Sequence, residues 1–153
     1  MSGRKVEYSA DDDNKFSVYQ NVFEKLKTFY SKNKLKSKWD CDIEDIYFVC
    51  RDMSDQKSVI TNKNCPSMLL FIWDLGLPVS GKNLILLTKN EYNQFNKLRQ
   101  NGGFEEWLAE NKDVMGKIQE FIEKCKVNYD HAFPAFTNLS KNLVTKAYFF
   151  LIL

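Results

Sequence analysis

The chain has 153 residues, of which 44% are hydrophobic, 14% aromatic and 27% charged. This length and composition fit a single ordered domain whose core needs no disulfide or metal staples, and they exclude a chain that is disordered throughout. The net charge of +2 excludes a histone-like polycation, so binding to a polyanion would depend on a local face.

The N-terminal part is predicted to begin with flexible residues 1–13 and to continue as a helix over residues 14–32. Apolar side chains recur there at steps of three and four, the spacing of a helix with one apolar face: Phe16, Tyr19, Val22, Phe23, Leu26, Phe29 and Tyr30. Acidic residues 11–13 favour a helix start, and lysines gather toward its end. The alternative is a short strand over residues 15–20.

A basic block overlaps the end of this helix. Six lysines lie within fourteen residues: Lys25, Lys27, Lys32, Lys34, Lys36 and Lys38. Such a block is typical either of a solvated face or of a surface that contacts nucleic acid, and both interpretations stay open.

The middle of the chain predicts a sheet. Residues 45–53 alternate as a half-buried strand does, and residues 57–61 are rich in β-branched side chains. Residues 68–73 are apolar on both faces, which indicates a central strand, and residues 84–87 are a fourth candidate. Because these strands cluster instead of alternating with helices, the pattern favours an α+β fold with an antiparallel sheet of about four strands.

Helices are predicted to follow the sheet. Thr88 and Glu91 match a capping box, in which each side chain satisfies a backbone donor at a helix start. The glycines that follow Asn101 are typical of a left-handed helix end. Apolar residues then continue at helical spacing from Phe104 to Val127, so the C-terminal part of the sheet-and-helix domain is expected to be helical.

The domain plan is therefore a single α+β domain over residues 14–153. It comprises a sheet region at 45–88, helices at 88–128 and a C-terminal segment at 135–153. The last seven residues, 147–153, are all apolar, far short of the roughly twenty that a membrane-spanning helix needs. We expect them to form a buried strand or a partner-facing segment, and we expect no membrane span.

The beginning of the sequence lacks an apolar signal region, so we expect an intracellular protein of the nucleus or cytoplasm. The four cysteines lack a C-x-x-C pair and lie in apolar or irregular contexts, which predicts buried thiols without disulfides.

The stretch "GLPVSGKN", Gly76–Asn83, nearly matches a phosphate-binding loop. The loop would require a hydroxyl side chain where Asn83 stands, and it should open directly into a helix, whereas the capping box places the helix start at Thr88. We therefore predict a turn between two strands. A degenerate nucleotide-binding loop is the alternative.

No catalytic residue, cofactor or metal site is predicted. The single histidine, His131, is expected as a surface or capping residue in a loop, and it has no recognisable nucleophile pattern beside it. Four acids cluster at Asp40, Asp42, Glu44 and Asp45, but they lack calcium-loop spacing and predict a solvated acidic turn.

The stretch from Ser80 to Leu98 resembles the end of the positive-cofactor-four family of transcriptional coactivators. In that family a Gly-Lys turn leads to a short strand, a Thr or Asn cap, and a helix with an aromatic residue near its start. The matching residues here are Gly81-Lys82, Leu84 to Leu87, Thr88 and Tyr92.

Upstream, Tyr47 to Met53 is similar to the family's strand ending in Arg-Asp-aromatic, with Met53 in the aromatic position, and Asp12 to Phe16 is similar to its beginning. The resemblance covers at most a third of the chain and ends at Gly103. It implies a curved antiparallel sheet backed by a helix, dimerisation, and binding of single-stranded DNA.

These observations favour a non-enzymatic nucleic-acid-binding protein, with a single-stranded-DNA-binding transcription cofactor as its most specific form. Arg51 and Lys82 match the family motif by position, whereas Lys57 is chosen as a cation after a turn and Trp73 as an aromatic at a strand end. The candidate nucleic-acid contacts are Lys32, Lys34, Lys36, Lys38, Arg51, Lys57, Trp73 and Lys82. The alternative is a protein interaction module that assembles with itself or a partner through its C-terminal helices and apolar tail.

Overall fold

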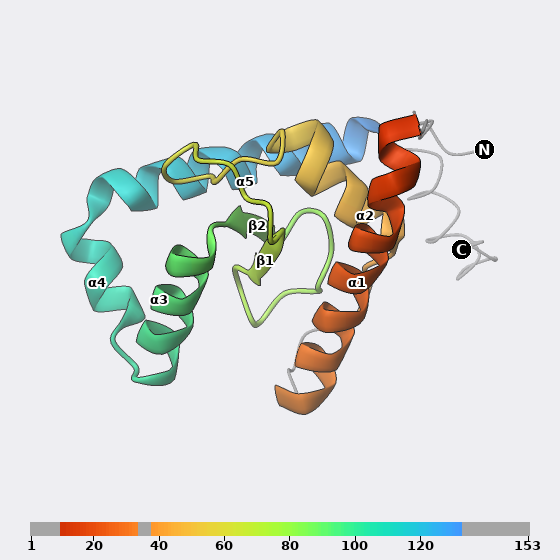
Figure 1. The fold of residues 1–153 in the computed structure, drawn as a ribbon. Coiled ribbons are helices and arrows are strands. Elements are labelled where there is room, and N and C mark those ends of the chain that lie inside the picture. Colours follow the sequence, from red (N-terminus) through yellow and green to blue (C-terminus); the bar gives the residue numbers. More distant parts are fainter. Residues whose placement is uncertain (1–9, 34–37, 133–153) are drawn as a thin grey trace.

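The structure, a computed structural model, describes residues 10–33 and 38–132 (Figure 1). Its elements in chain order are α1 (Ala10–Asn33), α2 (Ile43–Tyr47), the π-helix η1 (Phe48–Met53), β1 (Leu69–Ile72), β2 (Leu84–Leu87), α3 (Lys89–Gln100), α4 (Phe104–Glu110) and α5 (Lys112–Ala132). The predicted α+β class is confirmed. The predicted sheet of about four strands is wrong, because the described residues form a sheet of two.

The two strands pair antiparallel, with Leu69 opposite Leu87 and Ile72 opposite Leu84. The sheet is buried on both faces because its side chains, apolar at every position, alternate between two helical layers. Leu84 and Leu86 face a core formed with α1, α2 and η1. Ile85, Leu87 and Phe71 face the opposite core, formed with α3, α4 and α5. Figure 1 shows the short sheet between these layers, with α5 running past both.

Residues 45–53 are helical, which corrects the predicted strand. Asp42 caps α2 through a capping box with Asp45, and η1 continues the helix with wider hydrogen bonds such as Ser54 N to Val49 O at 3.1 Å. Every side chain from 46 to 50 is buried, so the alternation seen in the sequence did not separate an inner face from an outer one.

Residues 57–61 bend into turns, which corrects the second predicted strand. The Ser58 hydroxyl accepts hydrogen bonds from the amides of Ile60 and Thr61, at 3.0 and 3.1 Å, and this local bonding competes with strand pairing. One hydrogen bond connects the segment to β2, from Val59 N to Leu86 O at 3.1 Å. The segment therefore lines β2 without forming a strand.

The helical predictions are confirmed with shifted ends. α1 begins at Ala10, so residues 10–13 of the predicted flexible N-terminus belong to the helix. The capping box of Thr88 and Glu91 starts α3, and Gly102 has a φ of 78° where the chain leaves that helix. α5 continues to Ala132, so the backbone of His131 is helical where a loop was predicted.

Several predictions fall on residues outside the described ranges, namely 1–9, 34–37 and 133–153. These include Lys34, Lys36 and the C-terminal segment with its apolar tail. Among the described residues, no helix is both long and apolar enough to cross a membrane. The four cysteines are buried free thiols, as predicted.

Candidate functional site

The loop of residues 73–83 joins the two strands, and Asn83 holds it together. The buried Asn83 amide group donates to the carbonyls of Asp74 at 2.8 Å and Pro78 at 3.1 Å, while its oxygen accepts from Asp74 N at 2.9 Å. The residue that a phosphate-binding loop would replace by a hydroxyl therefore has a structural role: it closes the loop on itself.

The other end of the loop is fixed by a buried carboxylate. Gly81 N donates to Asp45 Oδ1 at 2.9 Å, and Asp45 Oδ2 accepts from Asp42 N at 2.8 Å. The Tyr129 hydroxyl, from α5, hydrogen-bonds to the same carboxyl group. A Cβ at Gly81 would lie 2.7 Å from Asp45 Oδ1 and 2.9 Å from the Tyr129 ring, so only glycine fits here.

Burial raises the pKa of two groups in this contact, the Asp45 carboxyl and the Tyr129 hydroxyl. Removal from water is the largest cause that raises the pKa of Asp45 well above its usual range, and the nearby charge of Asp42 raises it further. Burial likewise raises the pKa of Tyr129, followed by the charge of Asp45. The acidic cluster predicted as a solvated turn is therefore corrected: Asp42 is exposed, but Asp45 is an interior residue that connects α2, α5 and the loop.

This geometry differs from that of a phosphate-binding loop in two ways. The Gly81 amide, which would face a phosphate, already donates to the Asp45 carboxylate. In addition, the chain after Lys82 forms strand β2 and not a helix. The loop is a connection between two antiparallel strands, as the turn interpretation predicted.

Two of the predicted basic residues lie together around Asp40. Lys38 is adjacent to the loop because Val79 N donates to Lys38 O at 2.9 Å. Burial is the largest influence on the pKa of Asp40 and raises it, whereas the nearby charges of Lys38 and Lys82 lower it. The Lys82 ammonium lies 5.3 Å from the centroid of the Tyr129 ring, a distance that permits a cation–π contact.

Trp73 and Lys82 line one pocket of about 360 Å³, between the loop and α5. Lys126 from α5 lines it as well, and its ammonium forms an exposed ion pair with Glu123 at 3.5 Å. The polar part of the wall also contains the amides of Asn83 and Gln119 and the carboxylates of Asp74 and Glu123. We call this the basic pocket, defined by Trp73, Lys82 and Lys126.

A second pocket, of about 760 Å³, adjoins the basic pocket and shares Trp73 and Asp74 with it. Phe104, Arg99 and Glu105 line its other side. We call it the acid–aromatic pocket, defined by these five residues. The Trp73 and Phe104 rings meet edge to face, with centroids 5.8 Å apart.

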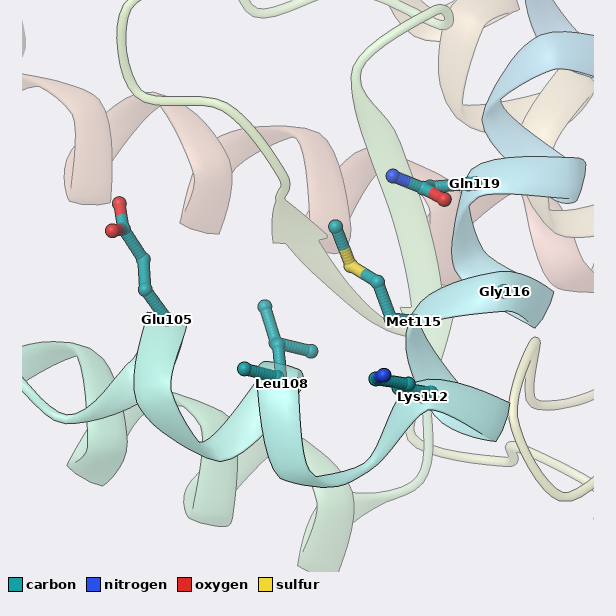
Figure 2. A pocket seen from close by; sticks show the side chains of 7 residues that line it. Glu105, Leu108, Lys112, Met115, Gly116 and Gln119 are labelled. Atoms are coloured by element: carbon teal, nitrogen blue, oxygen red, sulfur yellow. The ribbon is translucent and has the colours of Figure 1, made fainter.

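A third hollow, of about 390 Å³, lies between α4 and α5. Figure 2 shows Leu108 from α4 and Met115 from α5 extending into the same space, with Glu105, Lys112 and Gln119 at its edges. Its apolar floor distinguishes it from the basic pocket.

The other predicted contacts lie apart from the basic pocket. Arg51 lies in η1, with its guanidinium 5.9 Å from the centroid of the Tyr47 ring. Lys57 is half-buried in the bridge with Asn64, near the end of β2 that is distant from the loop. Lys32 is exposed in the last turn of α1. The structure thus brings Lys82 close to both Trp73 and Lys38. Arg51 and Lys57 lie elsewhere and line none of the three pockets.

Sequence reasoning missed Lys126, Asp45, Tyr129 and Arg99. No local pattern distinguishes Lys126 or Arg99 from other helical cations, because their neighbours come from distant segments. The spacing of Asp42 and Asp45 could have indicated a helix cap, since it matches the pattern found at Thr88 and Glu91.

The described residues contain no group of three or more histidine, cysteine or acidic side chains arranged to hold a metal ion. Comparison of the chain with protein-family models, with curated proteins and with solved structures finds no match. The segment Tyr47 to Met53, for which the coactivator resemblance implies a strand, is helical. The strand, cap and helix from Leu84 onward are present.

Proposed function

We propose that this protein is a non-enzymatic binding protein for single-stranded nucleic acid and that the basic pocket is its contact site. A transcription cofactor is the most specific form of this function, and the coactivator resemblance of residues 80–98 supports it. The observation that carries the proposal is the pocket itself, in which an aromatic ring and two ammonium groups from separate elements line one space.

This arrangement suits a single strand for a physical reason. Every base has a π-face that can stack on an aromatic side chain, and alanine substitution of such a platform costs about 1–3 kcal/mol per base. Trp73 can supply the platform while Lys82 and Lys126 meet the phosphates on either side of the base. Lys38 lies close to Lys82 through Asp40 and extends the basic surface past the loop.

The few cations predict weak and salt-sensitive binding. Neutralising each phosphate of a single strand changes the slope of log K against log salt by about −0.7. Three lysines therefore predict a slope of about −2. Nearby acids, including Asp74 and Glu123, reduce the electrostatic gain, so affinity should depend strongly on the stacked base.

Fluorescence anisotropy of a labelled single-stranded oligonucleotide, measured at several salt concentrations, tests the proposal. We expect binding at low salt that weakens as salt rises. In the Lys82→Ala and Lys126→Ala variants the slope should fall by about 0.7 each. Absence of binding at low salt, or binding indifferent to salt, rejects the proposal.

A matched control separates the basic pocket from general positive charge. Lys97→Ala removes an exposed cation on α3 that lines none of the three pockets. It changes the net charge as much as Lys82→Ala does, but it should leave the affinity and the salt slope nearly unchanged. Equal losses in the two variants would assign the binding to overall charge.

A second candidate function is self-assembly, and the apolar hollow between α4 and α5 favours it. The occupant would be the apolar tail, residues 147–153, of a second copy of the chain. Truncation after Lys146, and separately Met115→Glu in the hollow, should then lower the mass found by sedimentation. An unchanged mass in both variants rejects assembly through this contact.

A further inference from the structure

The acid–aromatic pocket combines three kinds of group around one space. The edge-to-face rings of Trp73 and Phe104 supply apolar surface. Two carboxylates, Asp74 and Glu105, are exposed at its rim. The Asp74 side chain is oriented by a hydrogen bond that its Oδ1 accepts from Gly76 N at 2.9 Å. An ionised carboxylate has about four acceptor positions, so both acids retain capacity for a ligand.

Arg99 fixes the floor of this pocket. Its guanidinium lies 4.1 Å from the Phe71 ring centroid and donates to the carbonyls of Ile72 and Trp73, each at 2.7 Å. Burial lowers the pKa of Arg99 to about 10, which leaves it cationic at neutral pH. Because the two bonds end on the last residue of β1 and the first residue of the loop, Arg99 positions the backbone of Trp73, and its charge offsets that of Asp74.

These groups match the Watson–Crick edge of some bases better than that of others. Aspartate and glutamate accept hydrogen bonds from exocyclic amino groups, as in contacts to cytosine N4. Thymine and uracil present carbonyl oxygens where cytosine presents an amino group, so a carboxylate facing them repels. The Trp73 and Phe104 rings, in contact with each other, form an apolar wall against which a base can lie, and the acceptors at the rim suit a base that carries an amino group.

We infer that the acid–aromatic pocket holds the nucleotide next to the one in the basic pocket and prefers bases with an exocyclic amino group. This inference rests on the proposed function, because it assigns base preference to the same site. The shared wall of Trp73 and Asp74 makes the two pockets neighbours, as consecutive nucleotides require. The acids that weaken attraction for phosphate thus acquire a role in reading the base.

The test compares two oligonucleotides of equal length in one buffer, one of 5-methylcytosine and one of thymine. Both carry the ring methyl group and the same phosphate charge, so they differ at the Watson–Crick edge. We expect the wild-type protein to bind the 5-methylcytosine strand about five- to tenfold more tightly, the lower part of the range for a specific base contact. Equal affinities would overturn the inference and leave the basic pocket standing.

Three variants assign the preference to its residues. Glu105→Gln and Asp74→Asn should each reduce the ratio of the two affinities, and the double variant should bring it close to one. Glu106→Gln removes an exposed acid that lines none of the three pockets and should keep the ratio. A ratio that survives in the double variant overturns the inference. Failure of both strands to bind the wild-type protein rejects the proposed function itself.

Discussion

Two helices of this protein begin with the same capping arrangement in opposite surroundings. Asp42 and Asp45 cap α2, and Thr88 and Glu91 cap α3, with both reciprocal bonds present in each. Asp45 is fully buried, where it also accepts from Gly81 N and from the Tyr129 hydroxyl. Glu91 is half-buried and accepts from the hydroxyls of Ser58 and Thr61, both at 2.7 Å.

The two caps show that burial changes both the pKa of a capping carboxylate and the segments that it holds in place. The pKa of Asp45 is raised because burial opposes its charge more than its hydrogen bonds favour it. Burial also acts to raise the pKa of Glu91, but the bonds from Ser58, Thr88 and Thr61 together lower it. The α3 cap also holds the turn at residues 58–61 near the surface, whereas the α2 cap fixes the loop of residues 73–83 from the interior through Gly81.

The largest effect on stability is expected at Asp45. Asp45→Ala leaves the Asp42 and Gly81 amides and the Tyr129 hydroxyl without their acceptor. The expected loss is about 3–5 kcal/mol of unfolding free energy, because buried donors left unpaired are costly. Urea unfolding of the variant and the wild type measures it. A loss below that of Glu91→Ala would contradict the contrast between the caps.

A smaller loss is expected when the loop is pushed away from Asp45. Gly81→Ala places a methyl group against Asp45 Oδ1 and the Tyr129 ring. Crowding of this kind costs about 1–3 kcal/mol and should shift Lys82 with the loop. Thermal unfolding measures the stability, and oligonucleotide affinity reports the shift. The control is Gly103→Ala, where an added Cβ meets no atom within 4 Å.

Removal of the Glu91 carboxylate should cost less than removal of the Asp45 carboxylate. Glu91→Ala should lower the unfolding free energy by about 1–2 kcal/mol, because Thr61 is exposed and Thr88 half-buried, so that both can turn to water and only Ser58 is buried. The same urea experiment measures this variant. A loss as large as that of Asp45→Ala would show that burial does not separate the two caps.

The two caps should respond to pH in opposite directions. The raised pKa of Asp45 means that its contribution to stability is present below the unfolded pKa, about 4, and is lost as pH rises through the folded pKa. The lowered pKa of Glu91 means that its contribution is present above about 4.3 and is lost as pH falls through the folded value.

Unfolding free energies of the wild type and the variants, measured at pH values below and above about 4, check the direction of the pH dependence at both caps. Asp45→Asn should flatten the decline toward higher pH, and Glu91→Gln should flatten the decline toward lower pH. If both variants flatten the decline in the same direction of pH, the direction of the pKa shift at Asp45 or at Glu91 is wrong.

The comparison also explains what the sequence could predict. α3 was predictable because polar residues surround its cap and a glycine pair ends it. α2 was not, because the five residues 46–50 that follow Asp45 are all buried, and continuous apolar segments have no period to distinguish helix from strand. The turn at residues 58–61 was not predictable either. Its β-branched residues favour a strand, and the pattern does not reveal that the Ser58 hydroxyl accepts from the amides of Ile60 and Thr61.

The residues of the candidate site likewise divide into those that the sequence could predict and those that it could not. Trp73 and Lys82 were predictable because they lie at the ends of one apolar strand and one turn. Lys126, Arg99 and Glu105 were not, since these helical residues lie 17 or more positions beyond Lys82 in the sequence and line the pockets only through tertiary packing. Local patterns predict which side chains a turn presents, whereas tertiary packing decides which helices meet it.

The emission of Trp73 during titration with a single-stranded oligonucleotide tests the central claim most directly. Stacking of a base on the indole should quench its fluorescence, and Trp73→Phe should remove that quenching while Trp39 and Trp107 remain. The proposed site predicts quenching that saturates with the anisotropy signal and weakens in Lys82→Ala. Binding without any Trp73-dependent change in emission would place the nucleic acid elsewhere and contradict the account.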